Sequence, residues 1–352
     1  MWTSAWGVRM TDDRLQLVAT IERLRRELDR ANKSVHEMAG MHDVVRDVIH
    51  RALQNVEPPA MPPMPKASRR KQREIALVHL SDWQIGALTP EYDLTVAREM
   101  ILGRLLDVVT KLTRERQQVA SVDECVVLLG GDMVDGSALR GTHAWDVESN
   151  VYQQAMHDCP RMMADFVLAL SSLFRKVRVE CVRGNHGRPA SFRANMNPAE
   201  VNWDSVAYET AKHMIKPDET KGRISWHNET ATFFRLIDMG KQTVLAIHGD
   251  QARGSGGFAG VPYYALARLV ARWSDSMPKD FDVMMLGHFH NPGLMTFGSK
   301  TIYVNGTTEI GSEWVLETLA MATRPAQRSA CSSGTLNTAS KATTSYGYRP
   351  NT

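Results

Sequence analysis

Apolar side chains recur every seven positions along residues 11–57, and this spacing predicts one long amphipathic helix. Thr11 is a suitable N-cap, and Asp12 and Asp13 place negative charge where the helix dipole favours it. A seam of this length favours a coiled coil that joins two copies of the chain; the alternative is a helix packed against its own domain. The seam consists of Arg14, Ile21, Leu28, Val35, His42, Ile49 and Val56 in one position and Met10, Leu17, Leu24, Ala31, Met38, Val45 and Ala52 in the other.

A linker at residues 58–73 follows this helix. Five prolines within residues 57–65 predict an extended, semi-rigid spacer. The linker ends in a basic run, which could contact a phosphate backbone or simply be solvated. The run consists of Lys66, Arg69, Arg70, Lys71 and Arg73.

The segment 74–322 alternates short apolar runs with longer amphipathic ones, which predicts an α/β domain. Its first half has strand–helix–strand spacing, and its second half has strands joined by tight turns, so we expect two sheets, one built by crossovers and one by hairpins. Strands are predicted at 75–80, 124–129, 177–183, 224–227, 233–237, 243–248, 283–286 and 301–305. Helices are predicted at 94–119, 151–174, 201–215 and 263–273.

Composition narrows the class of protein. With 43% hydrophobic and 23% charged residues among 352, the chain has the balance of a globular protein, and it has no apolar run long enough for a membrane span. Residues 323–352, rich in Ser, Thr, Ala, Gly and Asn, predict a flexible tail. The four cysteines lack paired spacing and no signal peptide is recognised, so we expect a cytoplasmic protein. A formal charge of +3 neither demands nor forbids a nucleic-acid partner.

Polar residues cluster where five of the predicted strands end. Carboxyl ends of strands gather ligand sites in open sheets, so we expect these segments to lie together. The segments are Ser81-Asp82-Trp83-Gln84, Gly130-Gly131-Asp132-Met133-Val134-Asp135-Gly136, Gly184-Asn185-His186-Gly187-Arg188, His248-Gly249-Asp250 and Gly287-His288-Phe289-His290.

These side chains suit two divalent cations. Carboxylate and amide oxygens bind hard ions, imidazole binds borderline ones, and no cysteine in the set offers a thiolate. A carboxylate shared by two cations holds them roughly 3.5–4 Å apart, the separation used for in-line displacement at phosphorus. The cations clamp the phosphate and lower the pKa of a bridging water, which becomes the nucleophile, and a histidine beside them can protonate the leaving oxygen.

The motifs resemble those of the calcineurin-like metallophosphoesterase superfamily, in the order D-x-H, G-D-x-x-D, G-N-H, a later histidine and G-H-x-H, over roughly residues 75–310. The resemblance implies a four-layer sandwich of two mixed β-sheets flanked by helices. It assigns Asp82 and His290 to the first metal, Asp132 to both metals, and Asn185, His248 and His288 to the second. It makes His186 the general acid, oriented by Asp135.

Two positions depart from the family pattern. Gln84 stands where the family usually has histidine; as a neutral oxygen ligand it would weaken the first site and favour Mn²⁺ or Mg²⁺ over Zn²⁺. Mn²⁺ is therefore the preferred cofactor, with Mg²⁺, Fe²⁺ or Zn²⁺ as alternatives. Arg188 follows Gly-Asn-His-Gly, where many members carry an acid, and it either binds a substrate phosphate or forms a salt bridge.

The same residues resemble phage-type proteins grouped with DNA-repair exonucleases, and this resemblance implies the cytosol of a bacterium or of a phage-infected host cell. This resemblance implies an enzyme, a metal-dependent phosphoric ester hydrolase that acts as a phosphodiesterase or nuclease on DNA. A homodimer formed through the N-terminal helix would place two sites on one nucleic acid. The alternatives are a small-molecule phosphatase or cyclic-nucleotide phosphodiesterase, and a binding subunit without catalysis.

Overall fold

The computed structural model describes residues 23, 40, 43–45, 47–54, 56–136, 147–189, 201–228, 233–254, 260–277 and 279–309. Most of the predicted coiled-coil seam and the whole tail predicted at 323–352 lie outside these residues. Within them, no helix is both long and apolar enough to cross a membrane.

The first sheet is built by crossover connections, as the spacing of its strands predicts. Its strand order is β1-β2-β3-β4, and each neighbouring pair is parallel. The continuous apolar run Cys125–Leu129 of β2 suits a strand that is covered on both faces. The strands are β1 (Arg73–Leu80), β2 (Ser121–Leu129), β3 (Lys176–Cys181) and β4 (Ile224–His227).

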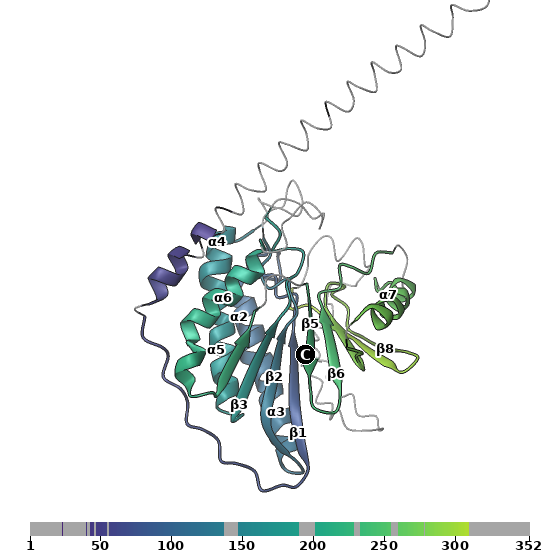
Figure 1. Cartoon of the computed structure of the whole chain (residues 1–352). Helices are drawn as coiled ribbons and strands as arrows, with labels where there is room; N and C mark the ends of the chain where they lie inside the picture. The colour runs from purple at the N-terminus through teal and green to yellow at the C-terminus, as the bar shows by residue number, and fades with distance from the viewer. Residues whose placement is uncertain are drawn as a thin grey trace, which may run out of the picture.

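Helices connect these strands and cover one face of the sheet (Figure 1). The two long helices predicted at 94–119 and 151–174 each contain a π-helical segment. The helical elements are α2 (Leu94–Arg98), η1 (Glu99–Leu105), α3 (Leu106–Gln117), α4 (Val151–Gln153), η3 (Gln154–Asp158), α5 (Cys159–Ser171), α6 (Trp203–Ile215) and η5 (Pro217–Thr220).

The second sheet is mixed, in the order β5-β6-β7-β9-β8. The pairs β5–β6 and β8–β9 are antiparallel, whereas β6–β7 and β7–β9 are parallel. The sequence pattern missed β8, an edge strand whose residues are all at least partly exposed. The elements are β5 (Phe234–Asp238), β6 (Thr243–Ile247), α7 (Tyr263–Ser276), β7 (Val283–Leu286), β8 (Gly293–Phe297) and β9 (Lys300–Val304).

Three apolar clusters separate four layers. One cluster lies between the two sheets and joins Leu77 and Val126 to Val244 and Met285. A second packs the other face of the first sheet against α5 and α6, and a third packs the second sheet against α7. The predicted sandwich of two sheets flanked by helices is therefore confirmed, with a first sheet that is parallel throughout its described strands.

The C-terminal end of the predicted N-terminal helix packs on the domain. Residues 43–45 and 47–54 are helical, Ile49 is buried, and Val45 and Leu53 lie against the core that includes α6. His50 Nδ1 donates a hydrogen bond of 2.7 Å to Nε2 of His213, whose Nδ1 donates to a backbone carbonyl. Over this stretch the seam serves intramolecular packing, and the dimer through the rest of the helix stays a prediction.

The proline-rich linker is hydrogen-bonded to the same domain. Arg223 and Arg175 donate hydrogen bonds of 2.6 and 2.7 Å to the carbonyls of Pro62 and Pro65. The basic run that follows leads directly into the first residue of β1. It therefore lies at the amino end of the sheet, and the polar segments lie beyond the opposite, carboxyl ends of the strands (Figure 1).

Candidate metal centre

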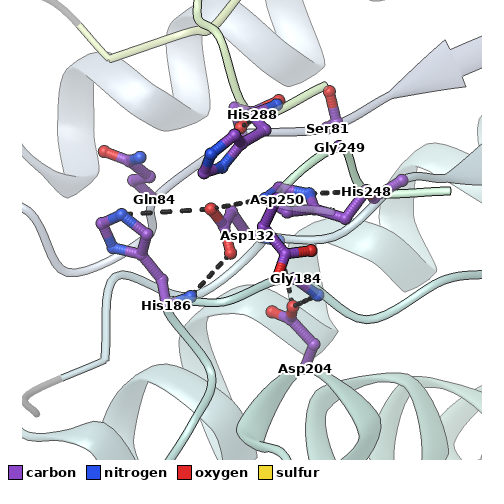
Figure 2. Close-up of polar contacts among 12 residues, drawn as sticks. Ser81, Gln84, Asp132, Gly184, His186, Asp204, His248, Gly249, Asp250 and His288 are labelled. Atoms are coloured by element: carbon purple, nitrogen blue, oxygen red, sulfur yellow. Dashed lines mark hydrogen bonds and ion pairs between the residues drawn. The ribbon is translucent and has the colours of Figure 1, made fainter. Parts of the chain in front are cut away.

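The polar segments of both sheets meet at one place, as Figure 2 shows. Asp82, Asp132 and His186 follow β1, β2 and β3, and His248 and His288 follow β6 and β7. Parallel strands end at the same edge, so these turns are brought together by the two sheets. Ligand atoms of Asp132, His248 and His288 all lie within 4.8 Å of one another.

Asp132 occupies the middle of this group. Its Oδ2 lies 2.8 Å from His248 Nε2 and 3.9 Å from His186 Nε2, and its Oδ1 accepts the backbone N–H of His186 at 2.8 Å. Burial would raise the pKa of Asp132, but the neighbouring charges of His248 and His186 outweigh it and hold the pKa well below its usual range. A carboxylate that stays ionised between imidazoles is suited to bridging two cations.

Three buried atoms of the cluster make no well-aligned hydrogen bond to a described residue: Asn185 Oδ1, and Asp132 Oδ2 and His248 Nε2, which instead face each other at 2.8 Å. An orphaned buried polar atom costs about 1–3 kcal/mol, so such atoms call for a partner. His248 Nδ1 donates to the carbonyl of Gly130 at 2.9 Å, which leaves the Nε2 lone pair directed toward Asp132. This is the orientation of a metal-binding histidine, and the donor set therefore fits a divalent cation.

A proton takes the place of the cation when none is bound. Burial lowers the pKa of His248, but the Asp132 carboxylate outweighs it and raises that pKa to about 10. At His288 the charges of Asp132 and Asp250 do not offset burial, and burial together with the charge of His248 lowers its pKa to about 4. Cation binding between Asp132 and His248 would consequently release a proton.

The other half of the cluster contains Asp82, Gln84 and His290. His290 Nε2 lies 3.6 Å from Asp82 Oδ1 and 2.9 Å from the amide Nε2 of Gln84. Half a turn of the Gln84 amide presents its oxygen to the same point, so the predicted ligand role of Gln84 is geometrically accessible. Burial raises the pKa of Asp82 to about 7, and the charge of Asp132 adds to this effect.

His186 stands beside these groups and is oriented by Asp135. Its Nδ1 donates to the Asp135 carbonyl at 3.0 Å and lies 3.3 Å from the carboxylate Oδ1, while Nε2 faces Asp132. Burial lowers the pKa of His186, but Asp132 and Asp135 together raise it to about 10. The histidine is thus held as a proton donor that points into the cluster.

The backbone is strained at most of the predicted ligands. Non-glycine residues pay roughly 1–2 kcal/mol for the left-handed region, and such strain concentrates at functional sites. Five of the predicted ligands have positive φ: Asp82 (55°), Gln84 (46°), Asp132 (53°), His288 (70°) and His290 (56°). Among the other non-glycine residues that the structure describes, only Lys216 and Lys221, which flank the 3₁₀-helix η5, have positive φ.

Two glycines let the carboxylates approach the neighbouring turns. A Cβ at Gly184 would lie 2.0 Å from Asp132 Oδ1, and one at Gly287 would lie 2.2 Å from Asp82 Oδ2. Any side chain would displace the carboxylate, so the glycines that precede Asn185 and His288 are required by the site itself.

Asp204 supports the site and was not predicted from the sequence. It is fully buried on α6, where its two carboxylate oxygens accept four backbone N–H groups. Oδ2 accepts from Asp132 and Gly184 at 2.9 and 2.8 Å, and Oδ1 accepts from Met133 and Val134 at 3.0 and 3.2 Å. Burial and the charge of Asp132 raise its pKa to about 6. In the sequence it looks like an ordinary acid in the first turn of a helix.

Arg188 forms an ion pair with Asp250, which is the salt bridge that the sequence offered as one of two roles for this residue. The side chains are only 13% and 12% exposed, and they join the turn after β3 to the turn after β6. The pair therefore lies beside the cluster, and the guanidinium is within the same group of loops as His186 and His248.

No family model matches the chain. It is 22% identical over 287 residues to an uncharacterized protein, YonJ, derived from the SPbeta prophage of Bacillus subtilis (strain 168). The match covers 79% of this chain and 66% of that protein, so the chain spans slightly less than two thirds of its relative.

Solved structures show weak likeness. A predicted phosphoesterase from Streptococcus pneumoniae TIGR4 matches with 12% identity, a TM-score of 0.25 and coverage of 66% of this chain and 72% of that one. Vps29 of Entamoeba histolytica complexed with zinc matches with 15% identity, a TM-score of 0.27 and coverage of 66% and 73%. Phosphopantetheinyl hydrolase of Mycobacterium tuberculosis matches with 13% identity, a TM-score of 0.29 and coverage of 67% and 90%. At these scores the architecture rests on the chain's own topology.

Proposed function

We propose that the protein is a dinuclear metal-dependent phosphoesterase, and that it hydrolyses phosphodiester bonds of DNA. The observation that carries the proposal is the convergence of the strand-end residues of both sheets on Asp132, with orphaned ligand atoms and a left-handed backbone at the same positions. Strain and unsatisfied polar atoms both cost stability, and metal binding offsets such costs.

The residues divide into two sets around Asp132. Asp82, Gln84 and His290 would hold the first metal, and Asn185, His248 and His288 would hold the second, with Asp132 shared. Bound divalent metals would neutralise phosphate charge and make a water nucleophilic at neutral pH. The chain itself supplies the fixed geometry of the donors and the buried environment that strengthens their electrostatic interactions.

His186 has the position of a general acid. Asp135 holds Nδ1, so Nε2 is the ring atom that faces the cluster, and its proton can pass to the oxygen that leaves phosphorus. Without that proton, the sugar oxygen that leaves phosphorus in DNA would have to depart as an unstable alkoxide. General acid catalysis of this kind contributes about 10²–10⁴-fold in rate.

The DNA substrate rests on the resemblance of the motifs to phage-type proteins grouped with DNA-repair exonucleases; the prophage-derived relative is uncharacterized and indicates no substrate. The basic run at the amino end of β1 does not support it, because that run lies opposite the cluster. Arg188, beside the cluster, is the cation in position to contact a phosphate, provided that Asp250 releases it.

The test is hydrolysis of linear DNA, bis-p-nitrophenyl phosphate and p-nitrophenyl phosphate in the presence of Mn²⁺. Wild type is compared with His186→Ala and with His157→Ala, a histidine whose side chain is 55% exposed on η3, as the matched control. We expect His186→Ala to lose 10²–10⁴-fold on DNA and less on the nitrophenyl diester, whose leaving group needs little protonation.

Each outcome bears on one part of the proposal. Hydrolysis of the monoester alone would replace the nuclease with a small-molecule phosphatase. Inactivity on all three substrates, with two Mn²⁺ ions bound, would favour a binding subunit. Equal activity of His186→Ala and wild type on DNA would remove His186 from the role of acid.

A further inference from the structure

Glu309 is a buried carboxylate beside the first metal site, and neither the strand-end motifs nor the resemblance assigns it a role. Glu309 is 5% exposed and follows β9, in a segment whose Thr308 backbone N–H donates to the Asp82 carbonyl at 3.3 Å. Its backbone N–H donates to Thr307 Oγ1 at 2.9 Å, and Thr307 Oγ1 in turn donates to the Asp82 carbonyl at 2.8 Å. The glutamate is therefore fixed to the same turn that carries the ligand.

The carboxylate faces the ring of His290 from the side opposite the metal ligands. Glu309 Oε2 lies 3.7 Å from His290 Nδ1, whereas Nε2 of the same ring lies toward Asp82 and Gln84. At 3.7 Å the two atoms lie just beyond hydrogen-bond distance, and a small rotation of either side chain would form the hydrogen bond. Metal-binding histidines commonly donate their other N–H to such a carboxylate, which orients the ring and raises its basicity.

The charge of the first site gives this carboxylate a second effect. Gln84 is neutral, so the first metal would otherwise rely on Asp82 and the shared Asp132 for negative charge. A buried anion close to His290 strengthens cation binding there more than it would in water, because burial lowers the effective dielectric.

We infer that Glu309 is a positioning residue for the first metal: it fixes His290 with Nε2 toward the metal and supplies negative charge beside the neutral Gln84. This inference rests on the proposed dinuclear site. It concerns only one of the two metals, since His248 of the second site is fixed instead by the Gly130 carbonyl.

The experiment measures Mn²⁺ binding to the metal-free full chain by titration calorimetry and by the electron paramagnetic resonance signal of free Mn²⁺. Wild type is compared with Glu309→Gln, Glu309→Asp and the exposed control Glu99→Gln, whose side chain is 64% exposed. The melting temperature of each metal-free variant is recorded as well. We expect Glu309→Gln to weaken one of the two sites about 10–100-fold, to leave the other unchanged, and to leave the metal-free melting temperature unchanged.

Glu309→Asp keeps the charge and should recover part of the lost affinity, whereas Glu99→Gln should match wild type. Equal affinity of both sites in Glu309→Gln and wild type would overturn the role of Glu309 and leave the dinuclear site intact. Parallel weakening of both sites with a lower metal-free melting temperature would also overturn it, since a purely structural role explains that result. Wild type that binds no Mn²⁺ would overturn the dinuclear site itself.

Discussion

Asp204 offers the sharpest test of how the cluster is held in place. Asp204→Ala removes the acceptor of four buried backbone N–H groups, those of Asp132, Met133, Val134 and Gly184. Each orphaned donor costs about 1–3 kcal/mol, so even the lower value, applied four times, gives about 4 kcal/mol. A domain of this kind is stable by roughly 5–15 kcal/mol, which makes this loss a large share of the total.

Asp204→Asn should remove only part of this contribution to the free energy of unfolding. One oxygen of the amide can serve two of the four donors, either the pair on Oδ1 or the pair on Oδ2, while the amide N–H₂ opposes the others. We therefore expect a loss of about 2 kcal/mol or more, between wild type and Asp204→Ala. The turn that carries Asp132 and the turn that carries Asn185 should also move. Mn²⁺ binding should therefore be weaker in Asp204→Asn than in wild type, and weakest in Asp204→Ala.

The free energy of unfolding of the metal-free chain, measured by denaturant titration, tests these values. Asp275→Asn, an exposed acid on α7, is the matched control and should lie within about 0.5 kcal/mol of wild type. An Asp204→Ala variant within 1 kcal/mol of wild type would refute the reasoning, because the four donors would then have found other acceptors at little cost.

Three further substitutions test other parts of the site. Gln84→His should tighten the weaker metal site by roughly tenfold and shift its preference toward Zn²⁺, which competition between Zn²⁺ and Mn²⁺ measures; an unchanged preference would remove Gln84 from the ligands. Arg188→Ala should raise KM for DNA by about tenfold with little change in kcat if the guanidinium binds a phosphate, whereas an effect on unfolding alone would leave it as a salt bridge to Asp250. Burial, and then the charge of His248, lowers the pKa of His79 to about 3. Below pH 6.5 the unfolded chain therefore binds more protons than the folded chain, so the free energy of unfolding decreases by about 1 kcal/mol for each pH unit by which the pH is lowered from 7 to 5. In denaturant titrations, His79→Leu should lose less stability than wild type over this range, and equal losses would contradict this expectation.

The predicted ligands could be located from the sequence because the ends of strands have local sequence signals. A run of apolar residues followed by Gly-Gly-Asp or Gly-Asn-His marks both the strand and its polar turn, and parallel strands place such turns at one edge. Asp132, His186 and His248 were predicted in this way and lie together in the structure. Asp204 and Glu309 carry no such signal, because their partners are far away in the sequence and neither follows a recognisable motif.

The linker shows the same limit. Its prolines predict an extended segment, and residues 57–70 contain neither helix nor strand. No pattern in residues 58–73 indicates that Arg175 and Arg223 donate hydrogen bonds to two of its carbonyls. The heptad seam likewise predicts a helix, but it does not determine whether a second copy of the chain or the chain's own domain packs against it. At Ile49 that surface is the domain's own core.

The sequence by itself determined the periodicity of helices and strands, the order of the motifs and the donor types, since these depend on neighbouring residues and on the chemistry of each side chain. Only the tertiary structure decided which distant groups meet. Burial of Asp204 under the Asp132 turn, the contact of Glu309 with His290 and the pairing of Arg188 with Asp250 all join elements separated by many residues. Such contacts form because the packing of two sheets and their helices minimises exposed apolar surface, and that is a property of the whole chain.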